Sequence, residues 1–469
     1  MANVFIQGVG GGGVKLATLS NPASASDVFS GYEGYDDTGT LIQGTYTTSN
    51  PTLSAPTISI SSSTLTITDS ANNGNFTDGF KIYVDGVLTA TQSASTYDLS
   101  GITDAGTYAI RVKAYATDFN DSALSNEVSY TVSASARIYG VSGLAYNSNA
   151  TALTRTDDAV GMTWTMSNNE ISSDFDNVFP YNEMVRTTIG SNVFVKIPAM
   201  WWRIGYNNSN LITDIAVSNA QMEAGTNQVV VQTPEFYYGA YGAYVSSYMY
   251  SVSGQTRTGN LTRISFRSTA TLWGAGYSLI DVVHTRILEF LWLIEFATRN
   301  SEDVMWGYTG FSGTTGATDN LTSPSGQLGA QDRMRYRYIE DFVGNGKEFF
   351  DGIYGVWVTD DASKYANSAG TGWTSFSIIN YAGSNDELAC MGIVDMNDPF
   401  LAPPGYTVQN SNYNTYYCDQ IVADNACYFY ARGRNSNLAG NGLFHWQGNA
   451  SSTWKATSIG SRLLYVPQS

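Results

Sequence analysis

The chain has 469 residues, a formal net charge of -17 and only 13% charged residues. This length suffices for about three domains of ordinary size, and the acidic balance argues against nucleic acid as a general partner, because phosphate binding requires clustered Lys and Arg. The N-terminus has no basic segment followed by an apolar one, and no apolar run reaches the roughly 18 residues of a membrane span. We therefore expect no membrane insertion and synthesis in a cytoplasm without a signal peptide.

Histidine and cysteine are scarce. The two histidines, His284 and His445, offer little material for a His-rich zinc site or a Ser-His-Asp triad. There are three cysteines, Cys390, Cys418 and Cys427. This is an odd number and too few for a disulfide framework. We expect free buried thiols, no metal site and no cofactor.

Residues 1–49 contain a glycine run, Gly10 to Gly13, that reads as a flexible or closely packed connector. The segment from Ser26 to Thr45 resembles a short β motif common in phage tail and baseplate-associated proteins. An ordinary β-hairpin with a Thr-Gly turn explains the same residues. The resemblance implies that residues 1–49 are a virion-attachment segment that docks on tail or baseplate proteins.

Residues 50–133 show short alternating strands separated by turn residues, with Asp85-Gly86 as a hairpin turn. This spacing is typical of an immunoglobulin-like β-sandwich, and Leu99 and Tyr108 resemble the anchor and tyrosine corner of fibronectin type III modules. No catalytic constellation lies within it. We interpret this domain as a spacer, followed by a small-residue linker, Ser133 to Arg137.

From residue 138 to 469 the pattern predicts one large unit. Residues 193–206 alternate as a strand pair around Pro198. The clearest helix spans Asp281 to Asn300, with Asp281 as N-cap and an apolar stripe that includes Ile287 and Ile294. His284 lies in this helix and reads as a partly buried histidine without a ligand role.

The C-terminal stretch has the composition of a recognition surface. Ten aromatic residues and eight asparagines lie between Tyr406 and Trp454. Tyr and Trp supply rigid contact area, while Asn, Ser and Gly supply adaptable hydrogen bonds. Residues 403–469 carry two acids and four bases, a net of +2 in an acidic chain. The final run, Ser458 to Val466, reads as a buried strand.

Four segments carry a family resemblance: Leu293–Ser301, Arg337–Ile353, Gly442–Phe444 and Ile459–Leu463. From Ile138 to the end, the chain resembles the C-type lectin fold, in the branch shared by formylglycine-generating enzymes and the variable proteins of diversity-generating retroelements, such as phage tropism determinants. The predicted fold class is mainly β, with a β-sandwich followed by an α+β C-type-lectin-like domain.

In that branch, framework residues hold a hypervariable C-terminal region, here about residues 405–466, whose exposed side chains bind a receptor. The resemblance implies a framework of Glu340, Gly344, Asn345, Asp351, Gly442, Leu443, Phe444, Gly460, Arg462 and Leu463. The ligand-binding residues that it implies are Tyr430, Arg432, Arg434, Asn435, Asn437, Asn441, His445, Trp446, Asn449 and Trp454, with Tyr413, Asn414 and Tyr416 as a flank.

Enzymatic alternatives have specific requirements. The closely spaced copper-binding cysteine pair of formylglycine-generating enzymes is missing, since Cys418 and Cys427 have eight residues between them. Asp395 to Asp398 can supply oxygen ligands to calcium, although an Asx-rich turn explains the same residues. Glycosidases require two facing carboxyl groups, and the adjacent acids Asp157-Asp158, Asp360-Asp361 and Asp386-Glu387 read as solvated turns.

We therefore expect a receptor-binding protein of a phage tail, located at the tail tip or fibre of the virion, and no enzyme. Its ligand would be a host cell-surface protein or glycan. A homotrimer fits the relatives that form fibre tips, although no heptad run is present to support it. The alternatives are a glycan-cleaving or formylglycine-type enzyme on the same fold and a cellular adhesin.

Overall fold

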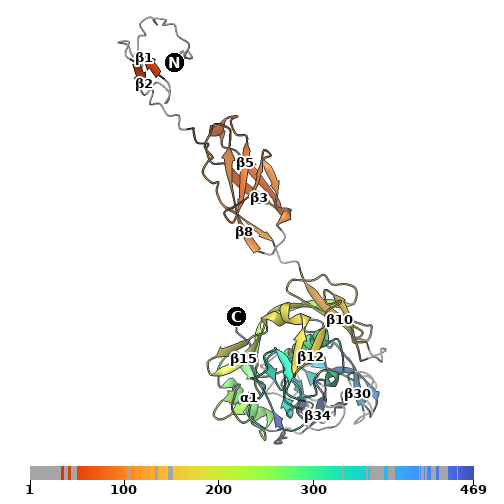
Figure 1. Ribbon diagram of the computed structural model, residues 1–469. Helices are drawn as coiled ribbons and strands as arrows, with labels where there is room; N and C mark the ends of the chain where they lie inside the picture. The colour runs from red at the N-terminus through yellow and green to blue at the C-terminus, as the bar shows by residue number, and fades with distance from the viewer. Residues whose placement is uncertain are drawn as a thin grey trace. The chain divides into compact units, whose positions relative to one another are not determined.

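The computed structural model describes residues 33–35, 41–43, 50–102, 106–132, 136–145, 151–311, 313–329, 332–354, 357–359, 374–378, 386–410, 412, 417, 420–423, 429–432, 442–450 and 453–468. The chain divides into two compact units, Met1–Ser135 and Ala136–Ser469 (Figure 1). The division falls within the stretch from Ser133 to Arg137, for which the sequence predicts a linker.

The first described elements of unit 1 are two short strands. Strand β1 (Glu33–Tyr35) pairs antiparallel with β2 (Leu41–Gln43), with Gly34 opposite Ile42. Antiparallel pairing of two neighbouring strands is typical of a β-hairpin. Attachment of this segment to a virion remains a prediction.

The rest of unit 1 forms two antiparallel sheets around one apolar core. Leu65, Ile82, Leu99, Ile110 and Val112 are fully buried in this core. Except for Leu99, which lies in a 3-10 turn, they alternate along their strands with exposed or half-exposed residues, as the two-residue side-chain period of a strand requires. The predicted β-sandwich thus has sheets in the order β3 (Thr57–Ser61), β4 (Thr64–Thr68), β7 (Thr96–Asp98) and β6 (Val87–Gln92), β5 (Gly79–Val84), β8 (Gly106–Tyr115), β9 (Val128–Val132).

Unit 2 is built mainly from β-sheets, so the predicted mainly-β fold class is confirmed. Three of its sheets have five strands each. The strand order of the first sheet is β11 (Thr154–Asp157), β10 (Ile138–Ser142), β17 (Ile212–Ser218), β16 (Met200–Tyr206), β18 (Gln228–Thr233). The order of the second is β12 (Trp164–Ser167), β13 (Glu170–Ser173), β23 (Ser325–Gln327), β24 (Met334–Tyr336), β25 (Ile339–Glu340). The order of the third is β14 (Arg186–Ile189), β15 (Asn192–Ile197), β19 (Phe236–Gly239), β36 (Leu463–Tyr465), β22 (Tyr277–Leu279).

A seven-stranded sheet contains the C-terminal stretch. Its order is β31 (Pro404–Gln409), β30 (Asp386–Met391), β32 (Gln420–Ala423), β34 (Trp446–Ala450), β33 (Phe429–Arg432), β26 (Lys347–Phe349), β35 (Ile459–Gly460). Two smaller sheets complete the described strands of unit 2: β20 (Tyr244–Val245) with β21 (Met249–Tyr250), and β27 (Ile353–Tyr354), β28 (Trp357–Val358), β29 (Thr374–Ser375).

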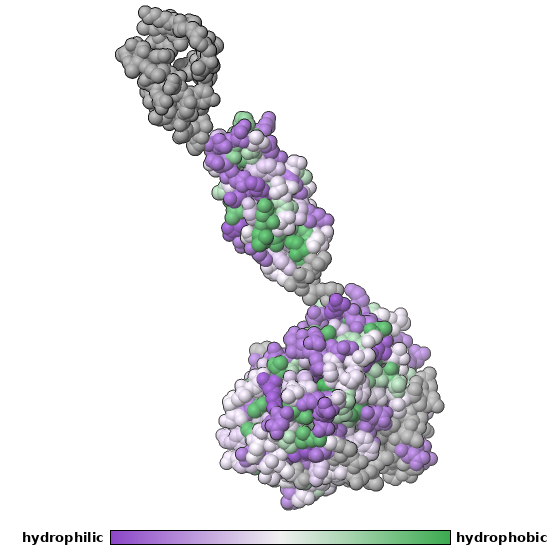
Figure 2. Space-filling model, in the orientation of Figure 1, coloured by the Kyte–Doolittle hydropathy of each residue, from purple (hydrophilic) through white to green (hydrophobic). Residues whose placement is uncertain are grey.

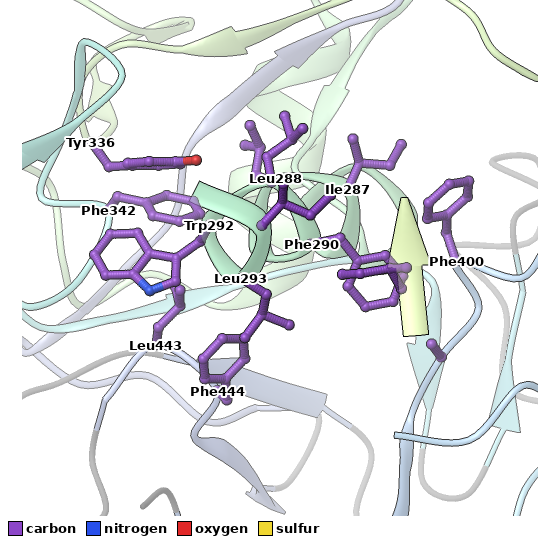
Figure 3. Close-up of a cluster of buried hydrophobic side chains, with 14 of the residues drawn as sticks. Ile287, Leu288, Phe290, Trp292, Leu293, Tyr336, Phe342, Phe400, Leu443 and Phe444 are labelled. Carbon is purple, nitrogen blue, oxygen red and sulfur yellow. The ribbon is translucent and has the colours of Figure 1, made fainter. Parts of the chain in front are cut away.

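Helix α2 (Val282–Phe296) forms the centre of the unit 2 core. The Asp281 side chain accepts a hydrogen bond from the His284 backbone N–H at 2.9 Å, which confirms the predicted N-cap. Ile287 and Ile294 of the predicted apolar stripe are buried, and burial extends beyond the stripe to nearly all sides of the helix. In Figure 3 its side chains project in several directions, toward Tyr336 and Phe342, toward Phe400, and toward Leu443 and Phe444.

Helix α1 (Arg263–Thr271) has no counterpart in the sequence prediction. Thr262 caps it by accepting a hydrogen bond from the Ser265 backbone N–H at 3.2 Å. Only Phe266 and Ala270 contribute apolar burial, and Arg263 is buried beside them. With so short an apolar repeat, a helical period is hard to detect in the sequence.

Two strand predictions need correction. Residues 193–206 form β15 and β16, which belong to different sheets and do not pair with each other. The predicted strand from Ser458 to Val466 is two short strands, β35 and β36, also in different sheets. Ser461 and Arg462 join them and are fully buried.

On the face drawn in Figure 2, hydrophobic residues of unit 2 appear as small patches among polar ones. Scattered apolar residues of this kind are normal for a protein surface. Within the described ranges, none of the helices is sufficiently long and apolar to cross a membrane.

Candidate ligand-binding region

The predicted variable region shares the seven-stranded sheet with strands outside it. Strand β26 pairs antiparallel with β33, with Glu348 opposite Arg432, and parallel with β35, with Glu348 opposite Gly460. At the other side, β30 pairs with β32, placing Asp386 opposite Ile421. Strands β32, β34 and β33 therefore lie between β30 and β26, whose hydrogen bonds fix their backbones from both sides.

The segment from Arg337 to Ile353, which carries the strongest resemblance, begins with a buried ion pair. The Nε–H and Nη2–H groups of Arg337 donate to the Glu295 carboxylate of α2, at 2.9 and 2.6 Å, and its Nη1–H donates to Asp176 at 2.7 Å. Burial raises the pKa of Glu295, and Arg337 opposes this shift. The pair ties the segment to the central helix.

Glu340 accepts hydrogen bonds along a neighbouring loop. Its carboxylate accepts the backbone N–H groups of Gly316 and Thr318, both at 2.9 Å, and a guanidinium N–H of Arg333 at 2.7 Å. Arg333 also pairs with Asp341, whose carboxylate accepts from the Asn345 side-chain amide at 2.8 Å. Each of these buried polar groups has a partner, as a loop-rich fold requires.

The turn at Gly344 and Asn345 depends on backbone conformation. Gly344 has φ +88°, and a Cβ there would lie 2.5 Å from the Tyr308 backbone nitrogen. Asn345 has φ +51°, a region in which Asn is one of the few tolerated side chains. This turn brings the chain directly into β26.

Asp351 connects the end of this segment to helix α1. The Asp351 carboxylate accepts from Arg267 Nε at 2.8 Å and also pairs with Arg263 at 3.6 Å. The Asp351 backbone N–H donates to the carbonyl of Ile280 at 2.8 Å, and the Val282 N–H donates to the carbonyl of Asp351 at 2.9 Å. The one residue thus positions α1 and the start of α2.

Arg462 is the hub of the C-terminal segment. Its guanidinium donates to Glu348 at 2.9 Å, to the Gly239 carbonyl at 3.1 Å and to the Glu340 carbonyl at 2.8 Å. Arg257 donates to the same Glu348 oxygen at 2.8 Å. Arg462 is completely buried, so these bonds satisfy a charge that has no access to water.

The segment Gly442–Phe444 docks on the end of α2. The Leu443 backbone N–H donates to the Ser301 hydroxyl at 3.0 Å, and both Leu443 and Phe444 are fully buried. The Phe444 ring lies edge-on to Tyr417, with centroids 4.9 Å apart. Two of the four segments that carry the resemblance therefore contact each other.

Two residues predicted to be exposed and to bind ligand are buried, so that part of the prediction is wrong. Trp446 is 2% exposed, packs edge-on against Phe350 at 5.6 Å, and lies under the Arg286 guanidinium at 5.2 Å. His445 is 1% exposed, and its Nε2 lies 3.2 Å from the Lys347 ammonium group. Burial lowers the pKa of Lys347 to about 8.

The other predicted ligand-binding residues divide into three groups. Trp454 is half-buried and contacts Phe349 edge-on at 5.7 Å. Tyr430 and Arg432 lie in β33 and Asn449 lies in β34. The remaining predictions fall outside the described residues: Arg434, Asn435, Asn437, Asn441, Tyr413, Asn414 and Tyr416.

The carboxylates considered for catalysis have other partners. Asp157 pairs with Arg203 at 3.0 Å and Asp158 with Arg137 at 3.2 Å. Asp386 and Glu387 are buried in β30, so the prediction that they form a solvated turn is wrong. Asp386 accepts from the Thr407 hydroxyl at 2.9 Å and Glu387 accepts from the Asn410 amide at 2.6 Å. Asp360 and Asp361 lie outside the described residues.

The candidate calcium run forms local turns. The Asp395 carboxylate accepts from the Asn397 N–H at 2.8 Å, and the Asp398 carboxylate accepts from the Phe400 N–H at 3.1 Å. These are the Asx turns that Asn and Asp commonly form. The part of the chain that the structure describes holds no group of three or more His, Cys, Asp or Glu suited to a metal ion.

Sequence reasoning missed several buried arginines. Arg257, Arg286 and Arg333 are each less than 10% exposed and contact the segments described above. A carboxylate such as Glu348, if buried, requires a cation as partner. The sequence alone gives no means to decide which arginine takes that place.

Comparison with known proteins gives distant similarities. Solved structures similar to this chain include variants of the Major Tropism Determinant. The I1 variant is 11% identical, with 89% of this chain and 96% of that chain covered and a TM-score of 0.25. The U1 variant is 12% identical, with 77% and 81% covered and a TM-score of 0.24, and the P3c variant is 12% identical, with 89% and 96% covered and a TM-score of 0.24. No family model matches, and no curated protein does.

Proposed function

We propose that this protein is the receptor-binding protein of a phage tail and that its C-terminal C-type-lectin-like unit displays a variable surface to a host cell-surface ligand. The proposal rests on the family resemblance in the sequence and on the arrangement of the residues that carry it. Binding is non-covalent, and the protein is not an enzyme.

The observation that supports it best is that some strands of the seven-stranded sheet belong to the buried framework and others to the segment predicted to vary. Strands β26 and β35 are fixed by the buried contacts of Glu348 and Arg462, whereas β32, β33 and β34 supply the segment predicted to vary. A framework that satisfies its own buried charges tolerates substitution at the positions predicted to vary, because its buried hydrogen bonds and ion pairs do not depend on the side chains at those positions.

The burial of His445 and Trp446 narrows the proposed contact set. We assign both residues to the framework, because a ligand cannot reach side chains that are 1–2% exposed. The proposed contacts are the remaining aromatic, amide and basic residues, with Trp454 at the edge: Tyr430, Arg432, Arg434, Asn435, Asn437, Asn441, Asn449, Tyr413, Asn414 and Tyr416.

Multivalent display suits such a surface. If residues 1–49 dock several copies on a tail, as a homotrimer or as repeated attachments, each later binding event becomes intramolecular and overall avidity rises. A modest affinity per copy then suffices for adsorption. Calcium and other cofactors have no part in this proposal.

The test is adsorption of the purified full chain to host cells, compared between the native protein and variants in the contact set. Loss of binding with an unchanged melting temperature supports the proposal, and unchanged adsorption contradicts it. Diversification has its own test in the flanking DNA. It predicts a near-copy of the segment encoding about Tyr416 to Val466, differing at template adenines, beside a reverse transcriptase gene.

A further inference from the structure

A contiguous set of aromatic rings lies on unit 2 outside the proposed contact set. Its members, called here the aromatic stripe, are Tyr237, Tyr465, Tyr277, Trp273, Tyr250 and Tyr248. They come from β19, β36, β22, the turn after α1, and the β20–β21 hairpin with its loop. Segments distant in sequence therefore supply one continuous set of rings.

The contacts between these rings run in sequence along the stripe. Ring centroids are 5.7 Å apart for Tyr237 and Tyr465, and 4.5 Å for Tyr465 and Tyr277. They are 6.1 Å apart for Tyr277 and Trp273, and 5.2 and 5.0 Å from Trp273 to Tyr250 and Tyr248. Trp273, Tyr250 and Tyr248 also contact one another, so the rings form one contiguous aromatic cluster.

The stripe rests on a rigid support. Phe194 is fully buried, and its ring centroid lies 6.3–6.4 Å from those of Tyr237, Tyr277 and Tyr465. The Trp273 indole N–H donates to the Met249 carbonyl at 2.6 Å, which fixes the orientation of the indole. The rings above this support remain partly open to solvent, and Tyr248 is 37% exposed.

An acidic and a basic side chain lie together at the Tyr237 end of the stripe. The Tyr237 hydroxyl donates to Glu235 at 2.6 Å, and Glu235 pairs with Lys196 at 2.9 Å, so the two opposite charges at its edge compensate each other. The hydrogen bond to Glu235 raises the pKa of Tyr237 to about 12, so this tyrosine stays neutral at physiological pH. A net charge of -17 repels polyanionic ligands.

We propose that the aromatic stripe binds an uncharged glycan. Aromatic carbon atoms contact the C–H groups of successive sugar rings, and tyrosine hydroxyls exchange hydrogen bonds with sugar hydroxyls, the dual character that makes Tyr and Trp common at recognition surfaces. The site shares no residue with the proposed contact set. It would add a second, weak hold on a glycan-coated cell.

Electrophoresis of the native full chain through gels containing mixed-linkage β-glucan tests the proposal, with alginate as the polyanionic comparison. We expect the β-glucan gel to retard the native protein and the alginate gel to leave its mobility unchanged. Tyr248→Ala and Trp273→Phe should each weaken β-glucan binding by about tenfold, the scale of an aromatic anchor. Trp357→Ala, which removes a 36% exposed tryptophan outside the stripe, should bind as the native protein does.

Tyr248→Ala should fold as the native protein does, because this exposed side chain contributes little to the core. A loss of glycan binding in this variant would therefore not be caused by misfolding. Absence of retardation by β-glucan, equal weakening by Trp357→Ala, or retardation by alginate alone would each overturn the proposal. The proposal would also be overturned if the native protein were an oligomer that Tyr248→Ala dissociates while glycan binding stays unchanged. The stripe would then be an interface between copies of the chain. Cell adsorption through the variable surface is measured separately, so failure of either proposal can be told from failure of the other.

Discussion

The guanidinium of Arg462 lies 2.9 Å from the carboxylate of Glu348, and both side chains are buried. This pair joins the end of β35 to β26, and β26 in turn pairs with β33 of the proposed binding sheet. Arg257 contacts the same carboxylate at 2.8 Å. The position of the proposed binding strands therefore depends on a buried ionic cluster.

Removing one partner of this cluster should be costly. We predict that Arg462→Met lowers the free energy of unfolding by about 3–5 kcal/mol, because Glu348 loses a partner in a site closed to water. Denaturant titration measures this change. Arg137→Ala, which removes a 63% exposed partner of Asp158, should cost at most about 1 kcal/mol. Similar costs for the two variants would contradict a structural role for the Arg462–Glu348 pair.

Gly344 should be far less tolerant of a side chain than a glycine with open space around it. Gly344→Ala places a Cβ 2.5 Å from the Tyr308 nitrogen, in addition to the strain of a positive φ. Gly190 has φ +61°, and a Cβ there would have no atom within 4 Å, so Gly190→Ala carries the backbone strain alone, about 1–2 kcal/mol. Thermal unfolding should show a larger loss for Gly344→Ala, and equal losses would show that the close approach to Tyr308 is relieved cheaply.

Trp446 should behave as a core residue. Trp446→Ala removes a ring that packs against Phe350 and Arg286, and it should lower the free energy of unfolding by about 3–5 kcal/mol. Loss of ligand binding in this variant would accompany loss of structure. A variant that unfolds like the native protein but no longer binds would return Trp446 to the contact set.

Lys347 should make stability depend on pH in the alkaline range. Burial lowers its pKa from 10.5 to about 8, so between these values the unfolded chain binds more protons than the folded one. The free energy of unfolding contributed by this group therefore rises from pH 8 to about pH 10, by on the order of 3 kcal/mol in full. Comparison with Lys347→Met removes the contribution of tyrosine ionisation. Parallel pH profiles for the two proteins would show that the pKa is not lowered.

The sequence predicts those parts of the fold that local patterns determine. Alternating strands such as Gly79–Val84 and the N-cap at Asp281 were accessible because a period or a cap needs only neighbouring residues. Pairing between strands that are distant in the chain cannot be predicted from neighbouring residues. For this reason β15 and β16, which follow each other in the sequence, look like partners although they are not. Burial of α2 on nearly all sides also depends on elements far from it in the chain.

The candidate region shows the same limit. An aromatic, amide-rich stretch has the composition of a surface, but composition does not separate exposed rings from buried ones. Trp446 and Tyr430 look equivalent in the sequence, yet Trp446 fills a place beneath Arg286 that only the three-dimensional structure defines. The residues next to Arg257 in the sequence do not show which carboxylate it contacts, because that partner is far away in the chain.

The central claim is that Tyr430, Arg434, Asn437 and the other proposed contact residues bind the host, while the buried cluster around Arg462 and Glu348 holds the neighbouring strands in place. The most direct test is adsorption to host cells by a variant that combines Tyr430→Ala, Arg434→Ala and Asn437→Ala. We predict at least a tenfold loss of adsorption, with a melting temperature unchanged from that of the native protein. Adsorption equal to that of the native protein, in a variant that is folded, would contradict the claim.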